Sequence, residues 1–284
     1  MRVVLGGGLS GLLVANKKGD SIVIEDQPRL GGVFSFDEVL GLKTPFHPPL
    51  ITSLSDYFDS KLVNLRIFSK KENYLLGKLK VPELPKWLVF NEKMYFVSHL
   101  SEKIDYLSRS VKVIHSSVKR IVGNRVITNK GIITADEIYS TISRKFIEEM
   151  LGIRSGLKSV SMLELVSITQ KKEREWDIYI NGDNGVVFSH VLNAYWLDEN
   201  YDVIYVIVPF LGTPPIWDKV YSDLKRERVL TKDEVIGFRS RIIKDAILIE
   251  SEELESISNI RLCGRLGKWK NFTLVEAVLD SLNC

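Results

Sequence analysis

Three glycines near the start of the chain have the spacing of a loop that binds the pyrophosphate of a dinucleotide. Gly6, Gly8 and Gly11 form the pattern Gly-x-Gly-x-x-Gly, and Glu25 follows nineteen residues after Gly6. In such a loop the first glycine permits a tight turn, the second lets the backbone approach the pyrophosphate, and the third lets a helix pack closely on a strand. A carboxylate at this distance accepts hydrogen bonds from the adenosine ribose, and it disfavours the 2′-phosphate of NADP.

The elements around these glycines are those that the motif requires. Residues 2–5 are an apolar run typical of a buried strand, and apolar residues between 9 and 15 predict a short helix that ends at Gly19. Residues 21–24 predict a second strand that ends at Glu25. The pyrophosphate is therefore expected at the N-terminus of the helix, against its N–H groups and the positive end of its dipole. A glycine-rich turn without a ligand is the alternative, and the agreement of strand, helix and acid weighs against it.

An Arg-x-Gly-Gly segment, from Arg29 to Gly32, follows Glu25 closely. It resembles the extension that follows the ribose-binding acid in one flavoprotein superfamily, which includes amine oxidases, protoporphyrinogen oxidase, phytoene desaturases and UDP-galactopyranose mutase. The resemblance implies that Gly31 and Gly32 let the backbone pass near the ribityl and pyrophosphate part of FAD. A flexible turn is the alternative for this glycine pair. The glycine motif alone does not separate FAD from NAD, and this resemblance favours FAD.

The C-terminal part of the chain gives an independent match. Residues 264–269 read Gly-Arg-Leu-Gly-Lys-Trp, and residues 273–282 predict an apolar helix. The segment resembles the closing strand and turn of the same superfamily, and the resemblance implies that Arg265 and Gly267 lie near the cofactor and Trp269 near the flavin. A surface ion pair for Arg265 and a core aromatic for Trp269 are the alternatives.

The middle of the chain predicts three short strands, at residues 117–122, 125–128 and 131–134, and a further strand at 135–141. These strands resemble the β-meander and return strand of the superfamily, in which the backbone at Val118 meets the adenine and the region of Thr141 approaches FAD. A core valine is the alternative for Val118. The cofactor-binding residues predicted in this way are Gly6, Gly8, Leu9, Ser10, Gly11, Glu25, Asp26, Arg29, Gly31, Gly32, Val33, Val118, Thr141, Gly264, Arg265, Gly267, Trp269, Thr273 and Leu274.

The resemblance predicts the α/β class, with an FAD/NAD(P)-binding Rossmann-like domain of a parallel sheet and a β-meander, and a smaller antiparallel-rich second lobe. The expected bounds are 1–60, 98–150 and 245–284 for the discontinuous FAD domain, and 61–97 and 151–244 for the substrate or cap lobe. Further elements expected in the chain's remainder are a hairpin at 73–82, strands at 160–169, 176–180, 186–192 and 203–209, and a helix at 215–227.

The flavin would carry the redox chemistry, so no side-chain triad is required. His47 is the candidate catalytic residue, because a similar Phe-His segment in the mutase family brings a histidine close to the flavin; a loop histidine between prolines is the equal alternative. His190 stands where the mutase resemblance expects an arginine that clamps a diphosphate. Trp87 and Tyr205 are candidate lining residues of a substrate cleft, with core aromatics as the alternative.

Composition and charge exclude several other classes of protein. The net charge is +3, from 39 basic and 36 acidic residues. This near-balance lacks the strong basic excess that is usual in nucleic-acid-binding proteins. Two cysteines, Cys263 and Cys284, supply neither a disulfide framework nor a zinc site, so a reducing cytoplasm is expected. Cys263 is expected to be a small buried apolar residue, with covalent flavin attachment as the alternative. No metal motif and no apolar stretch long enough to span a bilayer is present, and the sequence does not determine the oligomeric state.

The sequence therefore predicts an FAD-dependent oxidoreductase that acts on a small organic substrate. One alternative is a non-redox flavoenzyme of the UDP-galactopyranose mutase type. Another is a non-catalytic FAD-binding protein, which the small second lobe favours. Direct oxidation of NAD(P)H is disfavoured, because only one Gly-x-Gly-x-x-Gly motif follows a strand.

Overall fold

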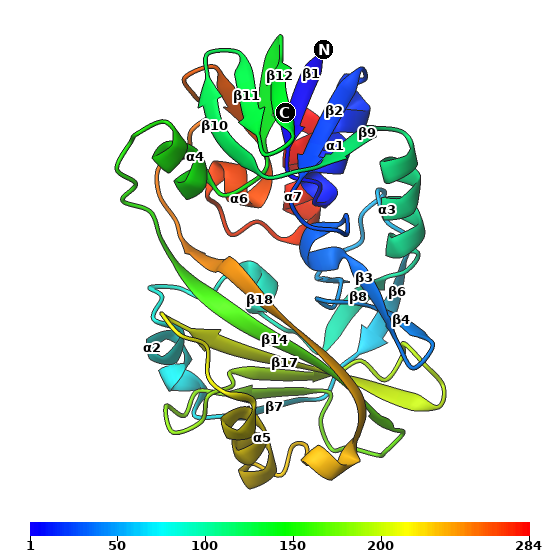
Figure 1. The fold of residues 1–284 in the computed structure, drawn as a ribbon. Helices are drawn as coiled ribbons and strands as arrows, with labels where there is room; N and C mark the ends of the chain where they lie inside the picture. Colours follow the sequence, from blue (N-terminus) through cyan, green and yellow to red (C-terminus); the bar gives the residue numbers. More distant parts are fainter. The chain divides into compact units, whose positions relative to one another are not determined.

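Separate stretches of the chain build each of two units (Figure 1). The computed structural model describes residues 1–284. Unit 1 consists of Met1–Ser35, His99–Lys158 and Glu250–Cys284, and unit 2 consists of Phe36–Ser98 and Ser159–Ile249. Residues 36–60, which the sequence analysis assigns to the FAD domain, thus lie in unit 2.

Unit 1 is centred on a six-stranded sheet in the order β19-β20-β13-β1-β2-β9, in which all strands except β19 run parallel. Its strands are β1 (Arg2–Leu5), β2 (Ser21–Glu25), β9 (Lys112–His115), β13 (Glu137–Ser140), β19 (Ser256–Ile257) and β20 (Ile260–Leu262). The strand order reverses between β1 and β13. In open α/β sheets, the crevice at such a reversal, beyond the carboxyl ends of the strands, is where ligands bind.

Two layers cover the faces of this sheet. Val126 of the three-stranded sheet β10-β11-β12 packs with Val3 and Ile138 on one face, and Val14 of helix α1 packs with Val23 on the other. The β-meander predicted from the sequence is therefore confirmed. The remaining elements of unit 1 are β10 (Val118–Val122), β11 (Arg125–Thr128), β12 (Gly131–Thr134), α1 (Leu9–Lys18), α3 (Leu100–Arg109), α4 (Arg144–Met150), α6 (Gly264–Lys268), α7 (Leu274–Asn283) and η1 (Gly32–Phe34).

Unit 2 contains a second six-stranded sheet, in the order β18-β14-β17-β16-β15-β7, which is largely antiparallel. Its strands are β7 (Ile67–Lys70), β14 (Lys158–Gln170), β15 (Ile178–Asn181), β16 (His190–Asn193), β17 (Tyr201–Phe210) and β18 (Val235–Ile249). The smaller elements are β3 (Phe36–Val39), β4 (Leu42–Pro45), β5 (Leu50–Ile51), β6 (Ser60–Asn64), β8 (Lys93–Val97), α2 (Leu75–Leu79), α5 (Trp217–Arg226), η2 (Glu72–Tyr74), η3 (Lys86–Leu88) and η4 (Lys232–Glu234).

The two faces of this second sheet differ in chemistry. Helix α5 covers one face (Figure 1). There Val220 and Leu224 pack on Leu165 and Val206. The strand register places Glu164 opposite Ile207, and Ile207 opposite His190. Directly paired residues project to the same face of a sheet, so Glu164 and His190 share the face that α5 does not cover.

One expectation about unit 2 is wrong, and one of its strands was not expected. The segment predicted as a hairpin at 73–82 forms η2 and the one-turn helix α2. Leu75 and Leu79 are both buried, and their spacing of four residues matches one face of a helix. The fifteen-residue strand β18 was not predicted, because its outward positions include apolar residues and obscure the alternation. No helix has the length and apolar character needed to cross a membrane.

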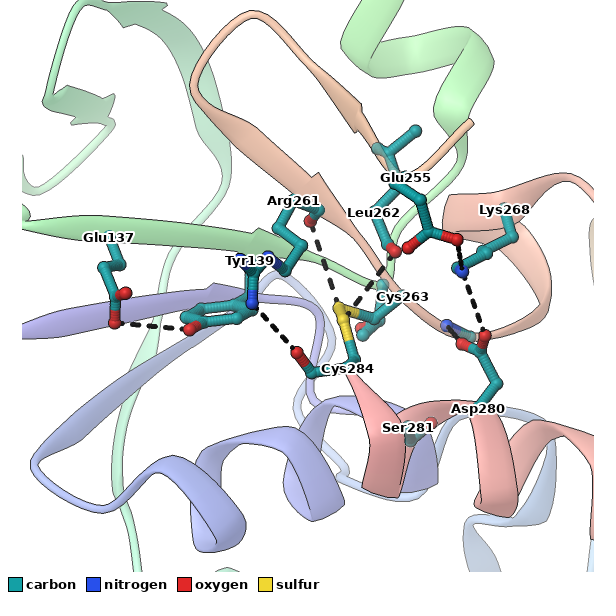
Figure 2. Close-up of a disulfide and its surroundings, with 12 residues drawn as sticks. Glu137, Tyr139, Glu255, Arg261, Leu262, Cys263, Lys268, Asp280, Ser281 and Cys284 are labelled. Carbon is teal, nitrogen blue, oxygen red and sulfur yellow. Dashed lines mark hydrogen bonds and ion pairs between the residues drawn. A yellow bond between two sulfur atoms is a disulfide. The ribbon is translucent and has the colours of Figure 1, made fainter. Parts of the chain in front are cut away.

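A disulfide links the two cysteines of the chain, which corrects the expectation that Cys263 is an unpaired apolar residue. Cys263 follows β20, and Cys284 lies at the end of α7, with 5.9 Å between their Cα atoms (Figure 2). Arg261 donates a hydrogen bond from Nη1 to the carbonyl oxygen of Cys284, at 3.2 Å. The end of α7 is thus covalently attached to the parallel sheet, and the Cys263 thiol is not available to bind a flavin.

Candidate functional site

The glycine turn between β1 and α1 has the backbone that the motif requires. Gly6 has a φ of +100°, which favours glycine, and its N–H donates to the carbonyl oxygen of Ile24 at 2.9 Å. A Cβ on Gly11 would lie 1.8 Å from the carbonyl oxygen of Gly6. The first and third glycines therefore have local structural roles, in the turn and in the contact between helix and strand.

Gly8 differs from its two neighbours in the motif. A Cβ added there would meet only the Cα of Gly32, at 3.8 Å. The second glycine segment runs alongside, since the N–H of Gly31 donates to the carbonyl oxygen of Gly7 at 2.9 Å. No side chain caps the N-terminus of α1, and its first turn carries no acidic residue. The surroundings of Gly8 therefore fit a pyrophosphate at the helix N-terminus.

Glu25 ends β2 and is tied to the glycine turn. Its Oε2 accepts a hydrogen bond from Gly7 N at 2.6 Å, and its Oε1 accepts one from Gln27 N at 2.8 Å. Burial raises the pKa of this carboxyl group, and the neighbouring Asp26 raises it further. Each carboxylate oxygen can accept a second hydrogen bond, so Glu25 retains the capacity to bind ribose hydroxyl groups.

The predicted adenine side of the site lies on the same edge of the sheet. The N–H of Ser116, which precedes β10, donates to the carbonyl oxygen of Glu25 at 2.8 Å. Val118 begins β10, two residues further on, and is buried in the core of unit 1. Thr141 follows β13, and its hydroxyl group donates to the carbonyl oxygen of Leu5 at 2.9 Å, directly behind the glycine turn.

The C-terminal motif packs against this turn. A Cβ on Gly264 would lie 2.7 Å from Ser10 Oγ, and a Cβ on Gly267 would lie 2.4 Å from the carbonyl oxygen of Ser140. These glycines thus bring α6 close to α1 and β13. The motif is a short helix rather than the predicted turn, and Trp269 at its C-terminus is fully buried.

Ion pairs of the buried Lys268 side chain hold α6 in position. The ammonium group of Lys268 lies 3.4 Å from Asp280 Oδ1 and hydrogen-bonds to Glu255 (Figure 2). Burial lowers the pKa of Lys268, but these acidic partners raise it more, so the net pKa is raised. Thr273 caps α7 in a capping box with Glu276.

The predicted cofactor residues therefore fall in one unit, where they occupy one glycine-lined edge and the helices behind it. Asp26 and Arg29 are exposed, and Leu9 and Leu274 are buried. Ser10, Val33 and Arg265 are half-buried. Their individual roles in binding FAD stay predictions.

The predicted catalytic histidine has a buried partner in unit 2. His47 Nδ1 lies 2.9 Å from Oε1 of Glu164, and the side chain of Glu164 is fully buried. The imidazole of His47 is 13% exposed, and its ring contacts Trp87 edge-on with 5.6 Å between ring centroids. Two of the residues predicted from the sequence, His47 and Trp87, are thus in direct contact.

The loop that carries His47 is anchored just before Phe46, at Thr44 and Pro45. Tyr205 donates from its hydroxyl group to the carbonyl oxygen of Pro45 at 3.0 Å, and Arg239 Nη2 donates to Thr44 Oγ1 at 2.7 Å. The Arg239 guanidinium also lies 4.1 Å from the centre of the Phe46 ring, a cation–π contact. In this structure Tyr205 is fully buried and acts as a support for the loop.

His190 is enclosed on the same face of the sheet. Its Nδ1 lies 3.0 Å from Ser189 Oγ, and its ring lies 5.7 Å from that of Phe90. Burial lowers the pKa of His190 to about 3. The imidazole is therefore uncharged at neutral pH.

Glu164 and Arg239 were not predicted from the sequence. Glu164 lies on the same face of strand β14 as Met162 and Val166, so the available signal was a single acid between apolar residues on one strand face. Arg239 had no such signal, because it lies in the strand β18 that was not predicted.

Comparisons with known proteins find likeness only in structure. No family model matches the chain, and no curated protein matches it in sequence. A protein from Exiguobacterium sp. assigned as a protoporphyrinogen oxidase has a TM-score of 0.75 at 12% identity, over 99% of this chain and 97% of that one. Reduced UDP-galactopyranose mutase has a TM-score of 0.72 at 11% identity, over 99% and 91%. A putrescine oxidase variant has 0.67 at 8% identity, over 99% and 97%.

These neighbours are proteins of the kinds that the sequence motifs resemble. The chain therefore shares the Rossmann-like α/β fold of these neighbours, as the sequence motifs predicted. At 8–12% identity this likeness defines the fold and leaves the substrate undefined.

Proposed function

We propose that this protein is an FAD-dependent oxidoreductase that acts on a small organic substrate. The observation that carries the proposal is the space beside Gly8, where only the Cα of Gly32 would meet an added Cβ. Bound FAD would supply the redox chemistry through its isoalloxazine ring. The fold and the two glycine segments support this cofactor, and structural neighbours that are oxidases support this class of reaction.

The residues of unit 1 would divide the binding of FAD among them. The N–H groups at the start of α1, around Leu9 and Ser10, would bind the pyrophosphate, and Glu25 would accept hydrogen bonds from the ribose. Gly31 and Gly32 would let the backbone pass close to the ribityl chain. Val118 and Thr141 would border the adenine and the pyrophosphate, and the α6 segment would lie near the flavin.

The substitution Gly8→Ala tests the cofactor site without disturbing the fold. The added methyl group meets no protein atom closer than 3.8 Å, so we expect the melting temperature of the apoprotein to stay unchanged. The methyl group would occupy the approach of the pyrophosphate, so FAD affinity should fall by about tenfold or more. Gly77→Ala, at a helical glycine with nothing within 4 Å, is the matched control and should bind FAD normally. Equal FAD affinity in Gly8→Ala and the wild type would refute the proposed site.

Reduction of the bound flavin tests the oxidoreductase. An anaerobic screen of amines and other small organic compounds should identify one that bleaches the flavin absorbance, and oxygen or another acceptor should restore it. A protein whose flavin is bleached by dithionite alone would instead be a non-catalytic FAD-binding protein.

A mutase of the UDP-galactopyranose type is the second candidate, because reduced UDP-galactopyranose mutase is a structural neighbour. His190 weighs against it. A neutral, fully buried imidazole cannot clamp a diphosphate as the arginine expected from the resemblance would. We expect no binding of UDP-sugars to the reduced protein by calorimetry, and micromolar binding would favour the mutase.

We propose that the protein is located in the cytoplasm. The Cys263–Cys284 disulfide weighs against it, because such bonds are rare in reducing compartments. Alkylation of the protein in intact cells, followed by mass measurement, would show whether the pair is reduced there.

A further inference from the structure

Glu164 is a carboxyl group whose burial costs free energy. It lies in the middle of β14 with a fully buried side chain, and its Oε2 has no hydrogen-bond partner. Burial of a charge costs free energy unless a partner of opposite charge and hydrogen bonds compensate it. Its Oε1 makes a hydrogen bond with His47 Nδ1 and with no other group. The hydrogen bond to the His47 imidazole therefore explains why a carboxyl group is buried at this position.

The loop is built to keep His47 over this carboxyl group. Tyr205 and Arg239 hold the backbone at Thr44 and Pro45, and Pro48 and Pro49 stiffen the chain after the histidine. Trp87 contacts the ring from its edge. A histidine held by anchors on the backbone before it and by contacts on its ring and its Nδ1 differs from a mobile loop residue.

We propose that Glu164 is a positioning residue that holds the His47 imidazole in the Nδ1–H tautomer and makes Nε2 the nitrogen that exchanges a proton with the substrate. The inference rests on the proposed function, since it gives His47 a part in the reaction. An ionised carboxylate can only accept a hydrogen bond, so Nδ1 must donate and the basic lone pair of the neutral ring lies on Nε2.

The proton balance of this step is simple. The proton that leaves a substrate X–H group binds to Nε2, and the electron pair of the broken bond stays on the substrate. His47 becomes an imidazolium, whose positive charge lies beside Glu164 at 2.9 Å. Pairing with a buried carboxylate stabilises this charged form, as in other carboxylate–histidine pairs.

Glu164→Gln is the informative variant, because glutamine keeps the shape and removes the charge. Its amide can accept from Nδ1–H or donate to Nδ1, so it no longer selects one tautomer. Asp177→Asn is the matched control: Asp177 is also buried in unit 2, but it pairs with Arg66. Circular dichroism and thermal melting of both variants establish that they are folded.

Nitrogen NMR of the histidine side chains reads the tautomer directly and needs no FAD. The chain has four histidines, so His47→Gln assigns the signal. We expect His47 to show the Nδ1–H pattern in the wild type and in Asp177→Asn, and a mixed or reversed pattern in folded Glu164→Gln. An unchanged His47 pattern in Glu164→Gln, or an Nε2–H pattern in the wild type, would overturn the inference.

Kinetics separate this inference from the proposed function. A protein that binds no FAD would refute the function, whereas the NMR result would still report on Glu164. With a substrate that reduces the flavin, Glu164→Gln should lower kcat by about a hundredfold, the usual range for an acid–base group, with KM and FAD content unchanged. A kcat equal to that of the wild type would show that Glu164 does not serve the reaction.

Discussion

The glycines of the first turn are required for different physical reasons, and substitution separates them. At Gly11 a methyl group would lie 1.8 Å from a backbone oxygen and 2.9 Å from Thr141 Oγ1, neither of which can move freely. We expect Gly11→Ala to lower the free energy of unfolding by about 3 kcal/mol, the upper range for overpacked sites. Urea denaturation of Gly11→Ala and Gly77→Ala checks this. Gly77→Ala should be neutral or slightly stabilising, because alanine is the better helix former. Equal stability of the two variants would contradict the packing argument.

Glu25 makes the stability of the apoprotein depend on pH. Its pKa is raised in the folded state, mainly by burial, so the folded state favours the protonated form. The resulting stabilisation is fully present below the usual carboxyl pKa and is lost as pH rises through the raised value. The melting temperature of Glu25→Gln should therefore increase relative to that of the wild type as pH rises from about 4 to 7. A constant difference between the two proteins across this range would contradict the assignment.

At the scale of residues, local rules predicted the glycine turn, because Gly6, Gly11 and Glu25 act within one strand–helix–strand segment. Glu164 could not be predicted as the partner of His47, because 117 residues separate them in the chain. Only the register of unit 2 brings the two side chains together.

At the scale of elements, the disulfide attaches α7 to the parallel sheet. It closes a loop with a sequence separation of 21 residues, and the loss of chain entropy in the unfolded state should stabilise the protein by about 3 kcal/mol. Reduction with a phosphine should lower the stability of the wild type by this amount and leave Cys284→Ser unaffected. Denaturation with and without reductant measures it. A wild type that is insensitive to reduction would show that the bond does not form.

The start of α7 depends on its capping box. Thr273 Oγ1 accepts from Glu276 N, and Glu276 Oε2 accepts from Thr273 N at 2.8 Å. Thr273→Ala should cost about 1 kcal/mol of unfolding free energy, whereas Thr273→Ser keeps the acceptor and should cost little. Chemical denaturation of the two variants compares them. Similar losses would indicate that packing, rather than the cap, holds this helix end.

Elements with strong periodicity were predicted well, and those set by tertiary contacts were not. Helix α7 and the turns of β10–β12 follow from local features, and both were confirmed, although Leu279 of the expected apolar stripe is exposed. Helix α2 replaced a predicted hairpin because Leu75 and Leu79 bury together against unit 2. The α6 helix replaced a predicted turn because Gly264 and Gly267 allow close contact with α1 and β13.

At the scale of the whole molecule, the fold class followed from three motifs spread along the chain. Each motif forms part of unit 1, where β1, β2, β13 and β20 lie in one parallel sheet. Unit 2 has no comparable motif, and its β18 and the buried Glu164 emerged only with the structure. The sequence thus predicts the structure where backbone geometry restricts the residue type, as in unit 1. The structure of unit 2 depends on packing that the sequence pattern does not reveal.

The visible spectrum of the purified protein, with identification of any nucleotide released by heat, tests the central claim most directly. We predict a flavin spectrum and the release of FAD, from the wild type but at reduced occupancy from Gly8→Ala. A colourless protein that stays colourless after addition of FAD would contradict the claim. It would leave a Rossmann-like domain for another adenosine ligand.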